Sequence, residues 1–85
     1  MTMQTDGKGH TYVDVENIRI TYIPAIDRDP DKDWSGSDVF RIQAYRGPDD
    51  RSLFQGAEFP ISSSEAFVQL ISGLCTLYLG SKEAT

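Results

Sequence analysis

The 85-residue sequence has little of several residue types on which common protein functions depend. A single cysteine, Cys75, excludes an internal disulfide and a cysteine-based metal site. No apolar run approaches the roughly 18 residues that a membrane-spanning helix needs. The first ten residues also lack the apolar segment of a secretory signal. We therefore expect a cytoplasmic protein without membrane spans.

Positive charge is scarce, because 8 Lys and Arg stand against 13 Asp and Glu and the net charge is −5. A broad nucleic-acid surface depends on clustered basic side chains that meet phosphates, so this balance disfavours one. The acidic residues are unevenly distributed along the chain, however, since most lie in residues 27–38 and at Asp49 and Asp50. The rest of the chain is close to neutral, which leaves room for a locally basic face.

Catalytic groups are also few. The only histidine, His10, lies at the edge of an N-terminal segment that contains Gly7 and Gly9. A serine or cysteine nucleophile would therefore have no rigidly held base. Paired carboxylates occur only in expected loops, which would not fix them at a catalytic separation. We predict that the protein is not an enzyme and needs no cofactor.

The acidic stretch from Pro24 to Asp38 has some of the spacing of a calcium loop, with aspartates at alternate positions from Asp27. Lys32 stands where such loops need a glycine for a sharp turn, and no helices flank the stretch. We expect a solvated loop with no metal site. Trp34 in this loop either folds back onto the sheet or projects as a partner contact, because tryptophan is enriched at interface hot spots.

Length and composition predict one small domain with a thin core. We expect residues 1–10 to form a mobile N-terminal tail, residues 11–80 the domain, and residues 81–85 a C-terminal tail. β-Branched and aromatic residues indicate strands in residues 11–23, 39–46 and 53–61. The first of these ranges is either a hairpin that turns at Glu16 and Asn17 or one long strand with a bulge.

The clearest pattern is a C-terminal helix. Ser62 and Glu65 fit a capping box at its start, and Gly80 suits the residue after its last turn. Between them the apolar residues recur at helical spacing and predict a buried stripe, with Cys75 beside it as a buried thiol. The stripe consists of Phe67, Leu70, Ile71, Leu74 and Tyr78. The predicted class is α+β, an antiparallel sheet of three or four strands with one face covered by the C-terminal helix.

The sheet face away from this helix carries arginines beside aromatic side chains. By strand parity it displays Arg19, Thr21, Arg41, Gln43, Tyr45, Phe54 and Glu58. Such a surface suits single-stranded nucleic acid, because bases stack on rings and guanidinium groups meet phosphates. The same enrichment describes protein interfaces, including one with a second copy of the chain.

The run from Arg41 to Leu70, RIQAYRGPDDRSLFQGAEFPISSSEAFVQL, resembles the single-stranded-DNA-binding domain of the transcription positive-cofactor-four family. That family has strand, turn, strand and helix in this order, with a pattern like IRxYxxxxGxxxxxxKGIxLxxEqwxxL. With a short insertion, Gly56, Glu65 and Phe67 fall near its glycine, its acid at the helix start and its helix aromatic.

The resemblance implies a homodimer with a DNA-binding sheet surface, in which Arg41, Tyr45 and Arg46 are the strand contacts that carry over. Two residues depart from the family pattern. Gln55 stands where a basic residue usually precedes the glycine, and Glu58 adds negative charge to the same strand. The basic character of the family is therefore missing.

These observations predict a small, non-enzymatic binding or regulatory domain that is homodimeric and acts through protein–protein contacts with an unidentified partner. The alternative is a weak single-stranded nucleic-acid-binding protein that uses the exposed sheet face. The candidate contact residues in both cases are Arg19, Arg41, Tyr45, Arg46, Phe54 and Trp34.

Overall fold

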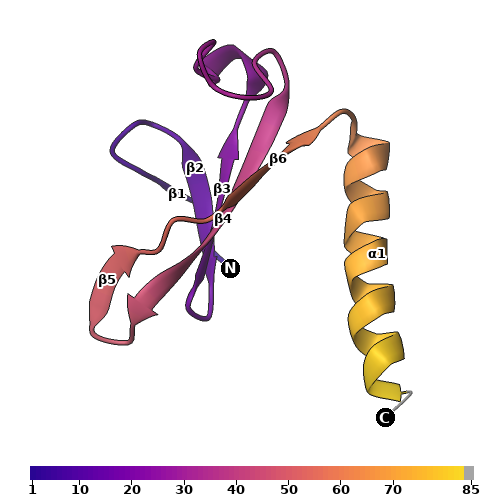
Figure 1. Cartoon of the computed structure of the whole chain (residues 1–85). Helices are drawn as coiled ribbons and strands as arrows, with labels where there is room; N and C mark the ends of the chain where they lie inside the picture. The colour runs from indigo at the N-terminus through magenta and orange to yellow at the C-terminus, as the bar shows by residue number, and fades with distance from the viewer. Residues whose placement is uncertain (84–85) are drawn as a thin grey trace.

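A computed structural model describes residues 1–83 and contains an antiparallel sheet followed by one C-terminal helix (Figure 1). The elements are β1 (Gln4–Thr5), β2 (Thr11–Val15), β3 (Ile18–Ile23), the 3-10 turn η1 (Ala25–Asp27), β4 (Asp38–Gly47), β5 (Asp50–Leu53), β6 (Ala57–Ile61) and α1 (Ser64–Glu83). The α+β class is therefore confirmed. The sheet has six strands rather than the three or four that we expected.

The first two long strands, β2 and β3, form a hairpin rather than one bulged strand. Their register pairs Val15 with Ile18, so Glu16 and Asn17 make the turn. Glu16 has a φ of 55°, the left-handed conformation that such tight turns require. The carbonyl of Asn17 accepts a hydrogen bond from the amide of Tyr45 at 2.9 Å, which ties the turn to β4.

The N-terminal segment that we expected to be a tail contains β1, which pairs with β2. The turn between these strands is organised by Asp6. Its carboxylate accepts hydrogen bonds from the backbone amides of Lys8 and His10, both at 2.9 Å. At the other end of the chain, α1 extends over Ser81–Glu83, and the last two residues of the expected C-terminal tail lie outside the described range.

Strand β4 is the centre of the sheet, with β3 along one edge and both β5 and β6 along the other. The single strand expected over residues 53–61 is therefore divided by residues 54–56. Gly56 lies in this break, directly against the backbone of β4. A side chain there would overlap the carbonyl of Ile42, so the close approach of the two strands requires glycine.

Helix α1 begins close to the expected position but ends later. The Ser63 hydroxyl accepts a hydrogen bond from the amide of Ala66 at 3.1 Å, so Ser63 rather than Ser62 caps the helix. Gly80 does not end it, because the helix continues to Glu83. No helix among residues 1–83 is long and apolar enough to cross a membrane.

The helix does not cover the sheet, which corrects our expectation. Its first turns contact β6 and β4, and beyond them α1 runs away from the sheet so that the two form a V (Figure 1). The radius of gyration is 14.6 Å. A compact domain of this length would have about 12 Å. The chain is thus markedly extended for its size.

The more polar face of the sheet is buried and the apolar face is not, which reverses the usual pattern. The side chains that are buried share the face opposite α1, and they are Thr21, Ile23, Arg28, Val39 and Tyr45. The loop that follows η1 and the turn between β1 and β2 lie over this face, because residues of both line one pocket with side chains of β3 and β4. The chain therefore covers the more polar face of its own sheet.

Candidate interaction surfaces

The first candidate surface is the sheet face on the side of α1, which we call the apolar face. The pairing register brings side chains of β2, β3, β4 and β6 onto it. These are Val13, Val15, Ile18, Ile20, Tyr22, Phe40, Ile42, Ala44, Ala57, Phe59 and Ile61. None of them is fully buried. An extended apolar sheet face that stays open is unusual for a monomer and marks an interaction site.

The second part of this surface is α1 itself. Beyond Phe67, its large apolar side chains have exposed fractions between 37% for Leu70 and 70% for Leu77. No charged residue occurs between Ala66 and Ser81. Cys75 is exposed as well, so the buried thiol that we expected is wrong for the single chain. An uncharged stretch of this length is typical of a helix with a covered surface, and this stretch is not covered by its own sheet.

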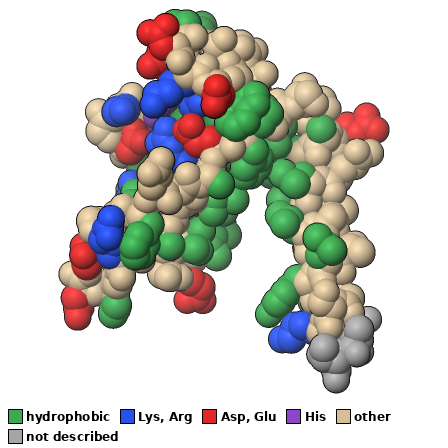
Figure 2. Space-filling model, viewed as in Figure 1, with side chains coloured by type: hydrophobic (Ala, Val, Ile, Leu, Met, Phe, Trp, Pro, Cys, Tyr) green, Lys and Arg blue, Asp and Glu red, His purple; other side chains and the backbone are tan. Residues whose placement is uncertain are grey.

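The helix and the apolar face enclose a groove of about 160 Å³ near the point where they join. All of its lining side chains are apolar, namely Ile20, Phe40, Ile42 and Phe59 from the sheet and Phe67, Leu70, Ile71 and Leu74 from α1. Hydrophobic side chains line both sides of the opening between the sheet and the helix (Figure 2). Beyond the junction, α1 diverges from the sheet (Figure 1).

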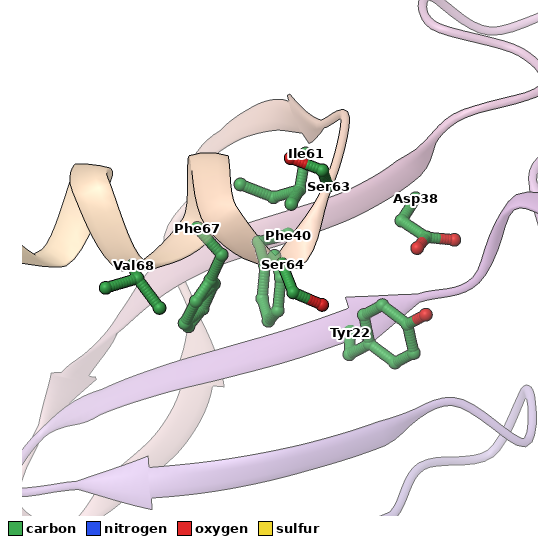
Figure 3. A pocket seen from close by; sticks show the side chains of 8 residues that line it. All are labelled: Tyr22, Asp38, Phe40, Ile61, Ser63, Ser64, Phe67 and Val68. Carbon is green, nitrogen blue, oxygen red and sulfur yellow. The ribbon is translucent and has the colours of Figure 1, made fainter.

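A pocket of about 450 Å³ lies at the start of α1 (Figure 3). The rings of Phe40 and Phe67, which also line the groove, form one part of it, and Tyr22 and Asp38 form the polar end. Burial raises the pKa of the Tyr22 phenol, and the nearby Asp38 carboxylate raises it further. The Tyr22 phenol and the Asp38 carboxylate thus form a polar rim beside the apolar surface.

The opposite face of the sheet holds a network around Tyr45. The Tyr45 hydroxyl donates to Asp14 Oδ1 at 2.8 Å and accepts from Arg19 Nη2 at 2.8 Å. The Arg19 guanidinium also lies 3.8 Å from the ring centroid of Tyr12, and that of Arg51 lies 3.6 Å from the ring centroid of Tyr45. These side chains are thus bound to one another within the chain.

A second network on this face joins the long loop to the sheet. Arg28 donates from both terminal nitrogens to the carboxylate of Glu58 at 3.2 Å, and Arg41 Nε donates to the same carboxylate at 2.9 Å. The Arg28 side chain is only 4% exposed. Its hydrogen bonds hold the pKa of Glu58 below the usual value, and Arg41 adds to this effect. Sequence reasoning missed Arg28, because a single arginine among aspartates has no distinguishing pattern.

The structure brings together some of the predicted contact residues and separates others. Arg19 and Tyr45 belong to one network, but Tyr45 is 2% exposed and its ring is not free to stack on a base. Arg41 is paired with Glu58. Arg46 lies 4.4 Å from the ring centroid of Phe54 at the other end of β4, where Phe54 is 46% exposed.

Trp34 lies apart from these residues, in the loop before β4. It has a φ of 60° and is 43% exposed, so it neither folds fully onto the sheet nor projects freely. In the same loop the carboxylate of Asp29 accepts a hydrogen bond from the backbone amide of Asp31 at 2.9 Å. Among residues 1–83, no group of three or more His, Cys, Asp and Glu side chains lies close enough together to hold a metal ion.

Comparison with known proteins adds no assignment, because no family model, curated protein or solved structure matches this chain. The resemblance of residues 41–70 to the positive-cofactor-four type domain therefore stays a prediction. The physical character of the two surfaces is the remaining guide to function.

Proposed function

We propose that the protein is a non-enzymatic, homodimeric interaction domain, and that the apolar face and α1 form its protein-binding surface. The observation that carries this proposal is the uncovered apolar surface on both arms of the V. On the opposite face the arginine and tyrosine side chains already satisfy one another, which favours the apolar surface as the binding site over the face that we first expected.

The exposed area supports an interface of substantial size. The chain exposes 6415 Å² and has a mass of 9.5 kDa. A compact monomer of this mass exposes roughly 5,000 Å². The excess of about 1,400 Å² exceeds the roughly 800 Å² that each partner buries in a standard protein–protein interface. Association of two copies through this surface would bring each chain close to the exposure of a compact protein.

Sedimentation equilibrium of the purified chain between 1 and 200 µM tests the proposal. We expect a dimer for the wild type and a monomer for Leu74→Glu, which places a charge in the groove, with a dissociation constant raised at least 100-fold. Thr76→Glu is the matched control, since Thr76 is exposed on α1 about half a turn from Phe67. This variant should dimerise like the wild type. A wild-type chain that stays monomeric at 200 µM would overturn the proposal.

The nucleic-acid alternative is tested in parallel by fluorescence anisotropy with a labelled 20-nucleotide single strand at low salt. We expect no saturable binding, because Arg19 and Arg41 are held by acids and Tyr45 is buried. Saturable binding that weakens steeply with added salt, and that Arg46→Ala reduces, would favour the alternative.

A further inference from the structure

We propose that the two copies interlock, so that α1 of each copy lies in the wedge between the sheet and the helix of the other. This inference rests on the proposed homodimer and specifies how the dimer is built. It commits to a second copy of this chain as the occupant of the wedge.

The narrow end of the wedge is fixed by the short connection between β6 and α1 and by the first turn of the helix. Ser62 and Ser63 alone connect β6 to α1, and the Ser63 hydroxyl fixes the first turn of the helix. The ring of Phe67 packs against that of Phe40 with centroids 5.3 Å apart. The helix is therefore attached at one end and diverges from the apolar face beyond it (Figures 1 and 2). A long apolar body is needed to fill the space.

Helix α1 of a second copy has the length and the apolar surface that are needed to fill the wedge. Helix α1 has 20 residues, and at 1.5 Å per residue it is about 30 Å long. Its apolar residues span a sector roughly 200° wide, from Leu77 through Phe67 to Leu79, at 100° per residue. A helix that covers a single surface needs a stripe of only about 100°.

The surplus width of this sector distinguishes interlocking from simple closure of the V. If α1 folded back onto its own sheet, the side with Phe67 and Leu74 would be covered but Val68 and Leu79 would remain in water. A helix inserted between a sheet and another helix contacts both, one on each flank of the sector. The two V-shaped chains can satisfy this arrangement reciprocally, as a two-fold symmetric dimer requires.

Charge also favours a second copy as the occupant. The acids that make the net charge −5 are concentrated in the loop before β4 and in the turn between β4 and β5. The walls of the groove carry no charged side chain. Two copies can therefore bring their wedges together without placing these acidic segments in the contact.

Complementation between two variants tests the exchange. Ile42→Lys alters the sheet wall of the wedge, and Leu79→Glu alters the flank of the inserted helix that its own groove leaves uncovered. In an interlocked dimer each variant alone carries two damaged contacts, whereas a mixed dimer has one intact contact and one Lys–Glu contact. We expect each variant alone to be monomeric at 20 µM and the equimolar mixture to form a 1:1 heterodimer in native mass spectrometry. Gln43→Lys, on the opposite face of β4, is the matched control and should dimerise alone.

The outcomes separate this inference from the proposed function. A dimeric wild type with a mixture that stays monomeric would overturn the interlocked arrangement and leave the homodimer standing. A dimeric Ile42→Lys would also overturn it, because the sheet would then not be part of the contact. A monomeric wild type would overturn both.

Cross-linking provides a second measurement with milder substitutions. A chain with Ile42→Cys and Cys75→Ser is mixed with the wild type, whose only cysteine is Cys75, and the mixture is oxidised. A disulfide between residue 42 and Cys75 can then form only between copies. We expect at least tenfold more of this product than with Gln43→Cys and Cys75→Ser. Equal yields from Ile42→Cys and Gln43→Cys would contradict the arrangement, provided that Ile20→Cys in place of Ile42→Cys gives the same result.

Discussion

The rings of Phe40 and Phe67 lie 5.3 Å apart and are tilted by 44°, and this contact attaches α1 to the sheet. Phe40 also stacks on Phe59 and lies 5.3 Å from the ring centroid of Tyr22. A row of aromatic rings thus crosses three strands and ends at the first turn of the helix. The direction of α1 depends on this row.

Replacement of Phe67 by alanine tests the attachment. Because the ring is only partly buried, we expect a loss of about 2 kcal/mol in the free energy of unfolding, below the 3–5 kcal/mol for a fully buried phenylalanine. Urea titration in the Leu74→Glu background, which we expect to be monomeric, measures it. Val68→Ala in the same background is the control, since Val68 is 63% exposed, and it should change stability by less than about 0.5 kcal/mol. Equal losses would show that the ring does not attach the helix.

The two arginines around Glu58 predict a pH dependence of stability. The pKa of Glu58 is lower in the folded chain than the ordinary value of a glutamate, so the folded state favours the carboxylate. Its contribution is fully present above the unfolded pKa and is lost as the pH falls through the folded pKa. We expect Glu58→Gln to cost about 2 kcal/mol at pH 7, because it leaves Arg28 without a counter-charge, and to flatten the loss of stability below pH 5.

Chemical denaturation from pH 3 to 7 measures this effect. Asp49→Asn, in the exposed turn after β4, serves as the control and should keep the wild-type pH profile. A profile that is unchanged by Glu58→Gln would mean that the arginine pair does not stabilise the charged form.

Replacing each of two glycines by alanine should change the stability in opposite directions. Gly56→Ala places a methyl group against the carbonyl of Ile42, and we expect a loss of about 2 kcal/mol because the backbone must move. Gly73→Ala adds the same group in open space on α1 and should stabilise the helix by about 1 kcal/mol. Thermal unfolding at one concentration compares them, again in the Leu74→Glu background. A stabilising Gly56→Ala would contradict the register of β4 and β6.

The hydrogen bonds of the Tyr45 hydroxyl predict that its removal lowers the stability of the folded chain. Tyr45→Phe removes the group that joins Asp14 to Arg19, and we expect a loss of about 1.5 kcal/mol. Tyr12→Phe is the control, because its hydroxyl makes a longer, exposed hydrogen bond of 3.3 Å to Gln4. This change should cost less than about 0.5 kcal/mol in the same urea titration. Comparable losses would argue against a special role for the Tyr45 network.

Local patterns predicted the class of this fold and its longer elements, but not β1 or the number of strands. Alternation placed a strand over Val39–Arg46, inside the observed β4, and the capping residues placed the start of α1 within two residues. Such patterns depend on neighbours in the sequence, which the sequence itself displays. The division between β5 and β6 was missed because it depends on the contact of Gly56 with the backbone of another strand.

The candidate site was harder to predict, because it depends on what covers each face. Strand parity separated an apolar from a polar face correctly in β3, β4 and β6, and we assumed that α1 would cover the apolar one. It misplaced Leu53, which pairs with Tyr45 of the polar face. Nothing local in the sequence fixes the direction in which a helix leaves a two-residue connection. The burial of Arg28 likewise depends on a loop that reaches back over the sheet, and that of Tyr45 depends on contacts with residues distant in the sequence, such as Asp14 and Arg51.

The open apolar face has a consequence for the life of the protein in a cell. If this surface is covered by a second copy, as we propose, the survival of each molecule depends on the abundance of the rest. Binding stabilises the folded state by mass action, so newly made chains at low concentration would be the most open to proteases and chaperones. The steady-state amount of the protein would then rise more steeply than its rate of synthesis, which gives a small gene product a threshold below which it hardly accumulates.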